Sequence, residues 1–260
     1  RRGAAEEPAV RAELDRLASQ CGDLAGLAVA LEEGLRAGLP PGAASEVRRR
    51  LAGLYAERLS SPDRAVRLLE ELAADAPRAE VLGALARLHR RAGSWRELAD
   101  VLRRQAAAAE DPRQRRDLLF EIGAVLDERL SDREGAMEAY RQILSVDPED
   151  PAALQRLGTL LGSAERWDEV VQLLDREAQS AERRPETATE GAEIRYRMGR
   201  VRQQRMGDAA GALHAYEAVL ARVPRRVNAH SPTAFCSSQI RTHLPHRMQR
   251  LMFRSMMALS

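Results

Sequence analysis

Apolar residues recur at three- and four-residue steps along most of this chain, and polar turn signals interrupt the pattern at regular intervals. Residues 118–151 show it most clearly. Leu118, Ile122 and Leu126 fall on one stripe of a helix with 3.6 residues per turn. After a polar turn, Ala136 and Tyr140 begin a second stripe that continues to residue 144. The pattern predicts two short amphipathic helices joined by a tight turn.

The ends of these two helices carry recognisable signals. Ser131 and Glu134 have the spacing of a capping box, which predicts that Ser131 opens the second helix. Asp147 precedes Pro148, and the residue before a proline is pushed out of the helical region, so the helix is expected to end there. The pair at residues 150–151, Asp-Pro, supplies a cap and a first-turn proline for the next helix.

The same hairpin pattern recurs along the chain. Trp95 and Trp167 occupy the same place in their second helices, and the phrase ERLS at residues 57–60 returns at residues 128–131. The hairpins therefore alternate in two versions, with a superperiod of about two hairpins. Hairpins are predicted at residues 8–40, 45–77, 79–112, 116–148, 151–185 and 192–224.

The hairpin of residues 118–151 resembles the tetratricopeptide repeat family, whose repeats are helical hairpins of about 34 residues. Gly123 matches the small residue of the family's first helix, and Ala136 matches the small residue of its second helix. Tyr140 matches the packing aromatic and Pro148 the terminal proline, whereas Ile143 stands where the family prefers alanine. The resemblance implies an all-α fold, a right-handed α-solenoid of about six hairpins over residues 8–224, in which each repeat contacts its neighbours.

Residues 225–260 depart from this pattern. They hold six arginines and no acidic residue, and Pro232 would fall inside the first helix of a seventh hairpin. We expect an irregular basic tail, either disordered or an artefact of the sequence. The alternative is a genuine basic amphipathic segment, Met248–Leu259, that contacts a membrane surface or a partner.

Charge and cysteine content narrow the class of protein. The net charge of +2 divides into −4 for residues 1–224 and +6 for residues 225–260, and the acidic balance of the array disfavours non-specific binding to nucleic acid. The two cysteines, Cys21 and Cys236, are far apart, which favours a reducing compartment, and we expect a cytoplasmic protein. The chain begins with Arg1, so the natural N-terminus is expected to lie upstream.

The sequence carries no signature of catalysis. It lacks the glycine-rich phosphate loop, the nucleophile elbow, the zinc-protease helix and the kinase motifs. His243 and His246, with Cys236 nearby, are residues that can bind metals, but their spacing fits no standard site. We therefore predict no enzyme activity, no cofactor and no metal site.

The tetratricopeptide resemblance places the first helices along a concave groove, which implies a protein partner bound there as an extended peptide or a helix. The arginines would pair with acidic groups of the partner, and two aromatic side chains would act as anchors. An ordinary solvated face is the alternative. The residues mapped to this face are Arg16, Arg49, Arg87, Arg90, Phe120, Asp127, Gln155, Thr159, Tyr196, Arg200 and Gln203.

Three functions fit this groove. The favoured one is a non-catalytic scaffold or adaptor, and the second is a docking or regulatory region of a larger enzyme or signalling protein. RNA binding through the groove arginines is the third, and the negative charge of the array argues against it. The family's asparagine and lysine clamp for a terminal carboxylate has no counterpart in these first helices.

Overall fold

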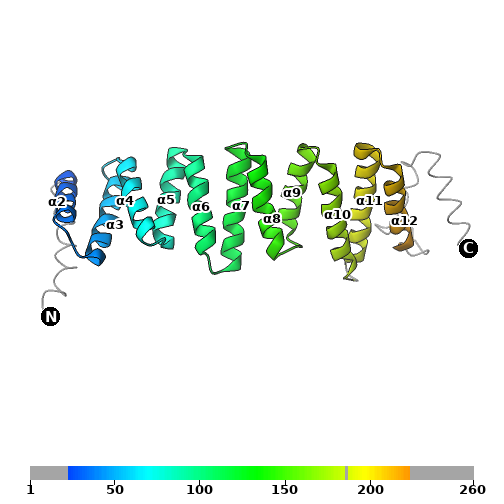
Figure 1. The fold of residues 1–260 in the computed structure, drawn as a ribbon, viewed down its shortest axis with the longest axis horizontal. Coiled ribbons are helices and arrows are strands. Elements are labelled where there is room, and N and C mark those ends of the chain that lie inside the picture. The colour runs from blue at the N-terminus through cyan, green and yellow to red at the C-terminus, as the bar shows by residue number, and fades with distance from the viewer. Residues whose placement is uncertain (1–22, 185–186, 223–260) are drawn as a thin grey trace, which may run out of the picture. The chain divides into compact units, whose positions relative to one another are not determined.

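The computed structural model describes residues 23–184 and 187–222, and within them the chain is all-α, as predicted (Figure 1). Eleven α-helices and one π-helical segment follow one another in this part of the chain. They are α2 (Leu24–Arg36), α3 (Pro41–Glu57), α4 (Pro62–Asp75), α5 (Ala79–Ala92), α6 (Trp95–Ala108), α7 (Pro112–Glu128), α8 (Arg133–Val146), α9 (Pro151–Ser163), α10 (Trp167–Glu182), α11 (Ala188–Val201), η2 (Arg202–Met206) and α12 (Ala209–Arg222).

The helices pack in sequence order as hairpins. The contacts divide the chain into two compact units, which meet within α8 at residues 139 and 140. In unit 1, α2 to α7 each pack against the next helix along the chain, and in unit 2 the same holds for α9 to α12. The first helix of the predicted 8–40 hairpin and the whole 225–260 tail lie outside the described residues.

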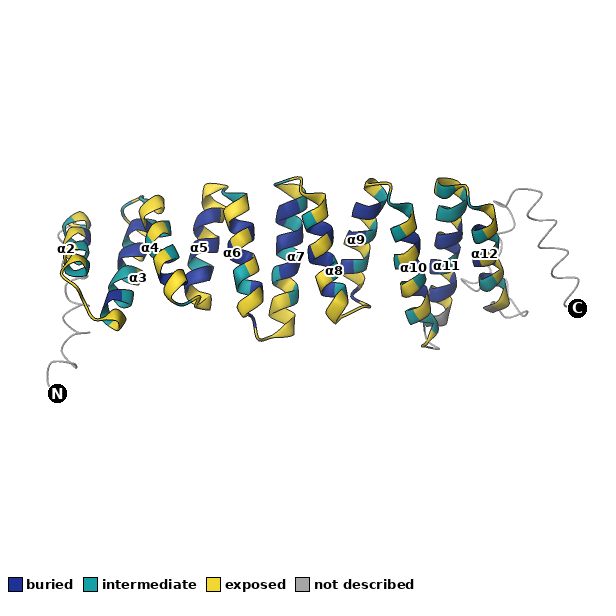
Figure 2. Cartoon of the chain, in the orientation of Figure 1, coloured by how far each residue is buried: buried dark blue, intermediate teal, exposed yellow. Residues whose placement is uncertain are grey.

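The predicted apolar stripes form the core of each unit. In unit 1, where α5 packs against α6, Leu82 and Leu85 of α5 and Leu98 and Leu102 of α6 are each at most 1% exposed. In unit 2, Tyr196 of α11 belongs to a cluster with Ala212, Tyr216 and Val219 of α12. Burying a leucine contributes about 1.5–3 kcal/mol, so these stripes supply most of the stabilising free energy. Figure 2 shows the buried and exposed positions along each helix.

Proline begins several helices where the sequence predicts it. Pro62 and Pro151 stand in the first turn of α4 and α9. At that place the missing N–H costs nothing, because the first N–H groups of a helix have no partner within it. Asp150 caps α9: its Oδ1 accepts a hydrogen bond from the N–H of Ala153 at 2.9 Å, and its side chain is buried.

The predicted capping box at Ser131 is wrong. Helix α8 begins at Arg133, and Asp132, not Ser131, accepts the capping hydrogen bond, from the N–H of Gly135 at 2.9 Å. Ser131 instead has a φ of 56°, in the left-handed region. At the start of α6, Ser94 holds the cap position but its side chain makes no capping hydrogen bond. The cap moves by one residue in α8 because the turn needs a left-handed residue directly before it.

That left-handed residue recurs between the two helices of the hairpins. It has a φ between 49° and 70° and comes directly before the N-cap of α4, α6, α8, α10 and α12. Glycine adopts this conformation at little cost, whereas a side chain with a Cβ is strained. The residues are Ser60, Gly93, Ser131, Glu165 and Gly207.

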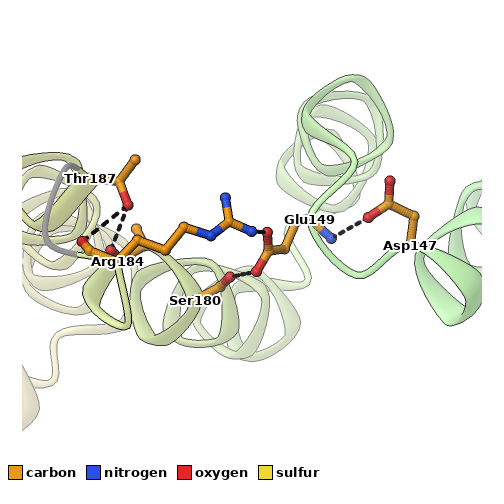
Figure 3. A network of polar contacts seen from close by, with 6 residues as sticks. Asp147, Glu149, Ser180, Arg184 and Thr187 are labelled. Atoms are coloured by element: carbon orange, nitrogen blue, oxygen red, sulfur yellow. Dashed lines mark hydrogen bonds and ion pairs between the residues drawn. The ribbon is translucent and has the colours of Figure 1, made fainter.

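A polar network joins the turn before α9 to the C-terminal end of α10 (Figure 3). The carboxylate of Glu149 accepts hydrogen bonds from the hydroxyl of Ser180 and the guanidinium of Arg184. The hydroxyl of Thr187 donates to the carbonyl oxygen of Ala181 at 2.7 Å, in the last turn of α10. The network orients this turn and contributes little stability, since Arg184 and Glu149 are both exposed to water.

Arginine–tryptophan contacts give the two-hairpin superperiod a physical basis. The guanidinium of Arg129, at the end of α7, lies 4.9 Å from the ring centroid of Trp95, the first residue of α6. In unit 2, Arg205 of η2 lies 5.2 Å from the ring of Trp167, the first residue of α10. In both cases an arginine at the end of a first helix covers the tryptophan of the preceding hairpin.

Replacing Glu165 with glycine is expected to stabilise the protein by up to about 1 kcal/mol. The substitution releases left-handed strain, and the gain is reduced by the extra chain entropy that glycine loses on folding. Urea denaturation followed by circular dichroism measures the change. The matched control, Glu165→Ala, keeps the strain and should give no gain; equal stabilisation by alanine would contradict this explanation.

Replacing Arg129 with methionine is expected to destabilise the protein by about 0.5–1 kcal/mol, the value of an exposed cation–π contact. Arg58 provides the control, because it holds the same place in the other ERLS phrase and covers no aromatic ring among the described residues. Arg58→Met should therefore change the denaturation midpoint much less. Equal losses for the two variants would show that the tryptophan does not matter.

Candidate functional site

A cleft runs between α3 and α5, the first helices of two consecutive hairpins in unit 1. The part beside the C-terminal half of α3, which we call the main part, has a volume of about 370 Å³. A second part of about 460 Å³ continues toward the N-terminal ends of the two helices, and Arg49, Glu80 and Val81 line both parts. The floor of the main part consists chiefly of small residues, Ala52, Gly53, Ala56 and Ala84.

The small residues keep this cleft open. A Cβ added at Gly53 would meet no atom within 4 Å, so the space above that residue is empty. Leu69 of α4 and Leu88 of α5 also line the cleft. A backbone or a narrow side chain could therefore approach α3 and α5 closely along this floor.

Three arginines line the main part of the cleft, together with Glu57 and Glu80. Arg49 of α3 donates to Glu80 of α5 at 3.5 Å and also pairs with Glu46. This bridge stands where the two parts of the cleft meet. Arg87 and Arg91, one turn apart on α5, are exposed and form no ion pair with the described residues.

The other mapped residues of unit 1 make contacts of their own. Arg90 forms an ion pair with Glu121 of α7. Phe120 is half-buried, and the guanidinium of Arg116 lies 4.7 Å from its ring centroid. Asp127 is half-exposed on α7. Arg49 and Arg90 thus link first helices of consecutive hairpins, and Arg87 alone of these three mapped arginines is left for a partner.

The mapped residues of unit 2 do not form a comparable cleft. Gln155 and Thr159 are exposed on α9, and the Thr159 hydroxyl donates to the carbonyl oxygen of Gln155 at 2.9 Å. Arg200 is exposed near the end of α11, while Gln203 accepts a hydrogen bond from the Tyr216 hydroxyl at 3.1 Å. Arg16 lies outside the described residues.

Tyr196 is not the exposed anchor that the sequence mapping suggested. It is only 8% exposed, and its ring centroid lies 5.7 Å from that of Tyr216. The mapping misplaced it because α11 packs against both α10 and α12, so more of its circumference is buried than one stripe implies. Gly199 belongs to the same contact: a Cβ there would lie 2.5 Å from the Tyr216 ring.

A second hollow, of about 360 Å³, lies in unit 2 between α8, α9 and α10. Leucines line it, with arginines at its rim. The resemblance did not point to this hollow, because it implies a groove along the first helices, whereas the hollow opens between two second helices. Leu173 was the available signal, because it lies outside the predicted buried stripe of its helix; Leu144 was assigned to the buried stripe and is only half-buried.

The described residues contain no candidate for two further classes of site, a metal centre and a membrane span. No group of three or more His, Cys, Asp or Glu side chains there could hold a metal ion, and residues 236–246 lie outside them. No helix in that part of the chain has the length and apolar character needed to cross a bilayer.

Residues 81–116, which contain α5 and α6, match the sequence model of the tetratricopeptide repeat family. These residues are assigned as one tetratricopeptide repeat. The helices of the chain, packed in sequence as hairpins, agree with this assignment. Tetratricopeptide repeats generally serve as protein-interaction modules. No curated protein matches the chain.

Solved structures of other repeat proteins resemble the chain. YrrB, described as a TPR protein with an unusual peptide-binding site, is 15% identical; the match covers 82% of this chain and 99% of YrrB, with a TM-score of 0.37. MamA is 22% identical over 64% of this chain and 93% of its own, with a TM-score of 0.36. A tetratricopeptide repeat protein from Parabacteroides merdae is 15% identical over 81% and 77%, with a TM-score of 0.39. Because these sequence identities and TM-scores are low, no partner or binding site of these proteins is assigned to this chain.

The stability of unit 2 is expected to fall between about pH 10 and pH 12 through Tyr216. Burial, and then the nearby Tyr196, raise the pKa of Tyr216 to about 12. The unfolded chain, in which a tyrosine titrates near 10, releases this proton first, so rising pH favours unfolding. Denaturation midpoints measured across this range should fall less steeply for Tyr216→Phe. Identical slopes for the two proteins would rule out this origin.

Proposed function

We propose that this chain is a non-catalytic scaffold that binds an extended peptide or a helix of a protein partner in the cleft between α3 and α5. The observation that carries the proposal is the floor of small residues beside Arg87 and Arg91, two exposed arginines without an ion pair in the described part of the chain. Repeat arrays commonly use such extended surfaces to bind other proteins.

The chemistry of the cleft favours an acidic partner segment. Arginine presents several N–H donors in one plane and can bind a carboxylate through two hydrogen bonds. Arg87 and Arg91 are four residues apart on α5, so both reach the same side of the cleft. Acidic side chains of the partner would pair with these two arginines while its backbone or small side chains lie over Gly53.

Filling the cleft should abolish this binding without harming the fold. Gly53→Leu places a side chain in empty space, and removing a glycine from a helix interior should leave stability unchanged or raise it by up to about 1 kcal/mol. Peptides selected from a displayed random library on the wild-type protein should be rich in Asp and Glu. They should bind Gly53→Leu and Arg87→Glu at least tenfold more weakly in a fluorescence titration.

Gly34 supplies the matched control, because a Cβ added there also meets no atom within 4 Å and the residue lies on α2, away from the cleft. Gly34→Leu should bind the selected peptides as the wild type does. If the peptides bind Gly53→Leu with undiminished affinity, the cleft is not where they bind and the proposal fails.

A further inference from the structure

The hollow between α8, α9 and α10 combines an apolar floor with a defined rim. Leu157 and Leu161 of α9 are buried and form its base, while Leu144 of α8 and Leu173 of α10 are half-buried and form its walls. Its volume of about 360 Å³ falls within the range of clefts that bind ligands, about 300–1,000 Å³. We call it the leucine groove.

The rim of the leucine groove has an excess of positive charge. Glu169 is its one lining carboxylate, and that carboxylate is already shared: it accepts hydrogen bonds from Arg141 of α8 at 2.8 Å and from Arg166 at 2.5 Å. Arg176, on the same helix as Glu169, is exposed and forms no ion pair with any described residue. Two arginines, Arg141 and Arg176, and one carboxylate line the groove, so its lining carries a net positive charge that a ligand with negative charge would complement.

The charge of Glu169 does not change near neutral pH. Burial opposes its ionisation, but the hydrogen bonds and charges of Arg166 and Arg141 together outweigh burial and lower its pKa. It is therefore ionised at neutral pH and remains engaged with these two arginines. Arg176 is left as the rim cation that a ligand can pair with at no cost to an existing contact.

The dimensions of the rim indicate the shape of the ligand. Glu169 and Arg176 are seven residues apart on α10, which corresponds to two helical turns, or about 10.5 Å. The groove lies between two second helices with α9 beneath, an arrangement into which the side-chain ridge of a third helix can pack. Leucine-type side chains at i, i+3 or i+4 spacing would meet the leucine floor, and a flanking carboxylate would reach Arg176.

We propose that the leucine groove is a second docking surface, separate from the α3–α5 cleft, and that it binds an acidic amphipathic helix of a partner protein. The apolar ridge of that helix lies against Leu144, Leu157 and Leu173, and one of its carboxylates pairs with Arg176. Helix-in-groove recognition of this kind takes its affinity from the apolar anchors and its orientation from the charged flank.

The test uses the full chain and a synthetic amphipathic helix of about four turns, with leucines at i, i+3 and i+4 spacing and glutamates on both flanks. Two companion peptides replace the glutamates with arginines, or the leucines with serines. Fluorescence anisotropy should show saturable binding of the first peptide alone. Arg176→Glu should weaken it at least tenfold, because the substitution replaces an attraction with a repulsion.

Two protein controls separate this surface from general charge effects and from the other cleft. Arg67→Glu makes the same charge change at an exposed position of the second helix α4, and should leave the affinity unchanged. Gly53→Leu, which fills the α3–α5 cleft, should also leave it unchanged; a loss there would place the peptide in that cleft and overturn this proposal alone. The absence of saturable binding, equal binding of the serine peptide, or an unaltered affinity in Arg176→Glu would each overturn it as well.

A lipid surface is the competing class of ligand for an apolar groove with basic rim residues. Vesicles containing anionic phosphatidylserine provide the comparison in the same assay. If the protein binds these vesicles but not the acidic helix, and Arg176→Glu abolishes the vesicle binding, that pair of results would replace the proposed protein partner with a membrane surface.

Discussion

Burial of helix stripes against the next helix along the chain is the constraint on which this structure depends. A two-helix layer is too thin to enclose its own apolar residues, so each hairpin must be covered by its neighbour. The near-zero exposure of Leu82, Leu85, Leu98 and Leu102 reflects this stacking in unit 1. Because the partner in each contact is close in sequence, the array is built from local contacts, and the polar sides of its helices remain free for other roles.

Many of those polar sides are used to join consecutive hairpins. Arg49–Glu80 and Arg90–Glu121 link first helices, and Arg104 reaches Glu70 of the preceding second helix at 2.8 Å. Exposed pairs of this kind contribute about 0–1 kcal/mol each, so they fix the register of neighbouring helices more than they stabilise the fold. Their functional consequence is indirect. All 41 basic residues of the chain are arginines. Arg87 and Arg176 each lie at the edge of a cavity and form no ion pair with the described residues, so they are candidates for binding a ligand.

The sequence was sufficient for the features that depend on period and on proline. The apolar stripes, the all-α class and the starts at Pro62 and Pro151 follow from local rules that the tertiary structure does not override. The cap of α8 did not follow, because the left-handed residue of the turn competes with the capping residue for the same place, and Ser131 can serve as either. The division into six hairpins and the account of the tail remain predictions, since both extend beyond the described residues.

The candidate site was harder to predict for a related reason. A helical period assigns a residue to a sector of the helix but not to the neighbour that covers that sector. Tyr196 was assigned to the groove and lies in the core beside Tyr216, and Arg90 was assigned to a partner and pairs with Glu121. The sequence features that correspond to the cleft are the alanines and the glycine of its floor. These residues carry no functional group, so they do not stand out as candidate binding residues.

The two proposed binding surfaces should differ in what gives them affinity. The α3–α5 cleft has a floor of alanine and glycine, and at about 25 cal/mol per Å² such small side chains offer little apolar area to a ligand. Its affinity must come mainly from Arg87 and Arg91, and exposed charges are screened within about 8–10 Å at physiological ionic strength. The leucine groove offers larger apolar side chains and one free rim cation, so salt should weaken it less. A scaffold with both surfaces could therefore hold two partners whose release responds differently to ionic conditions.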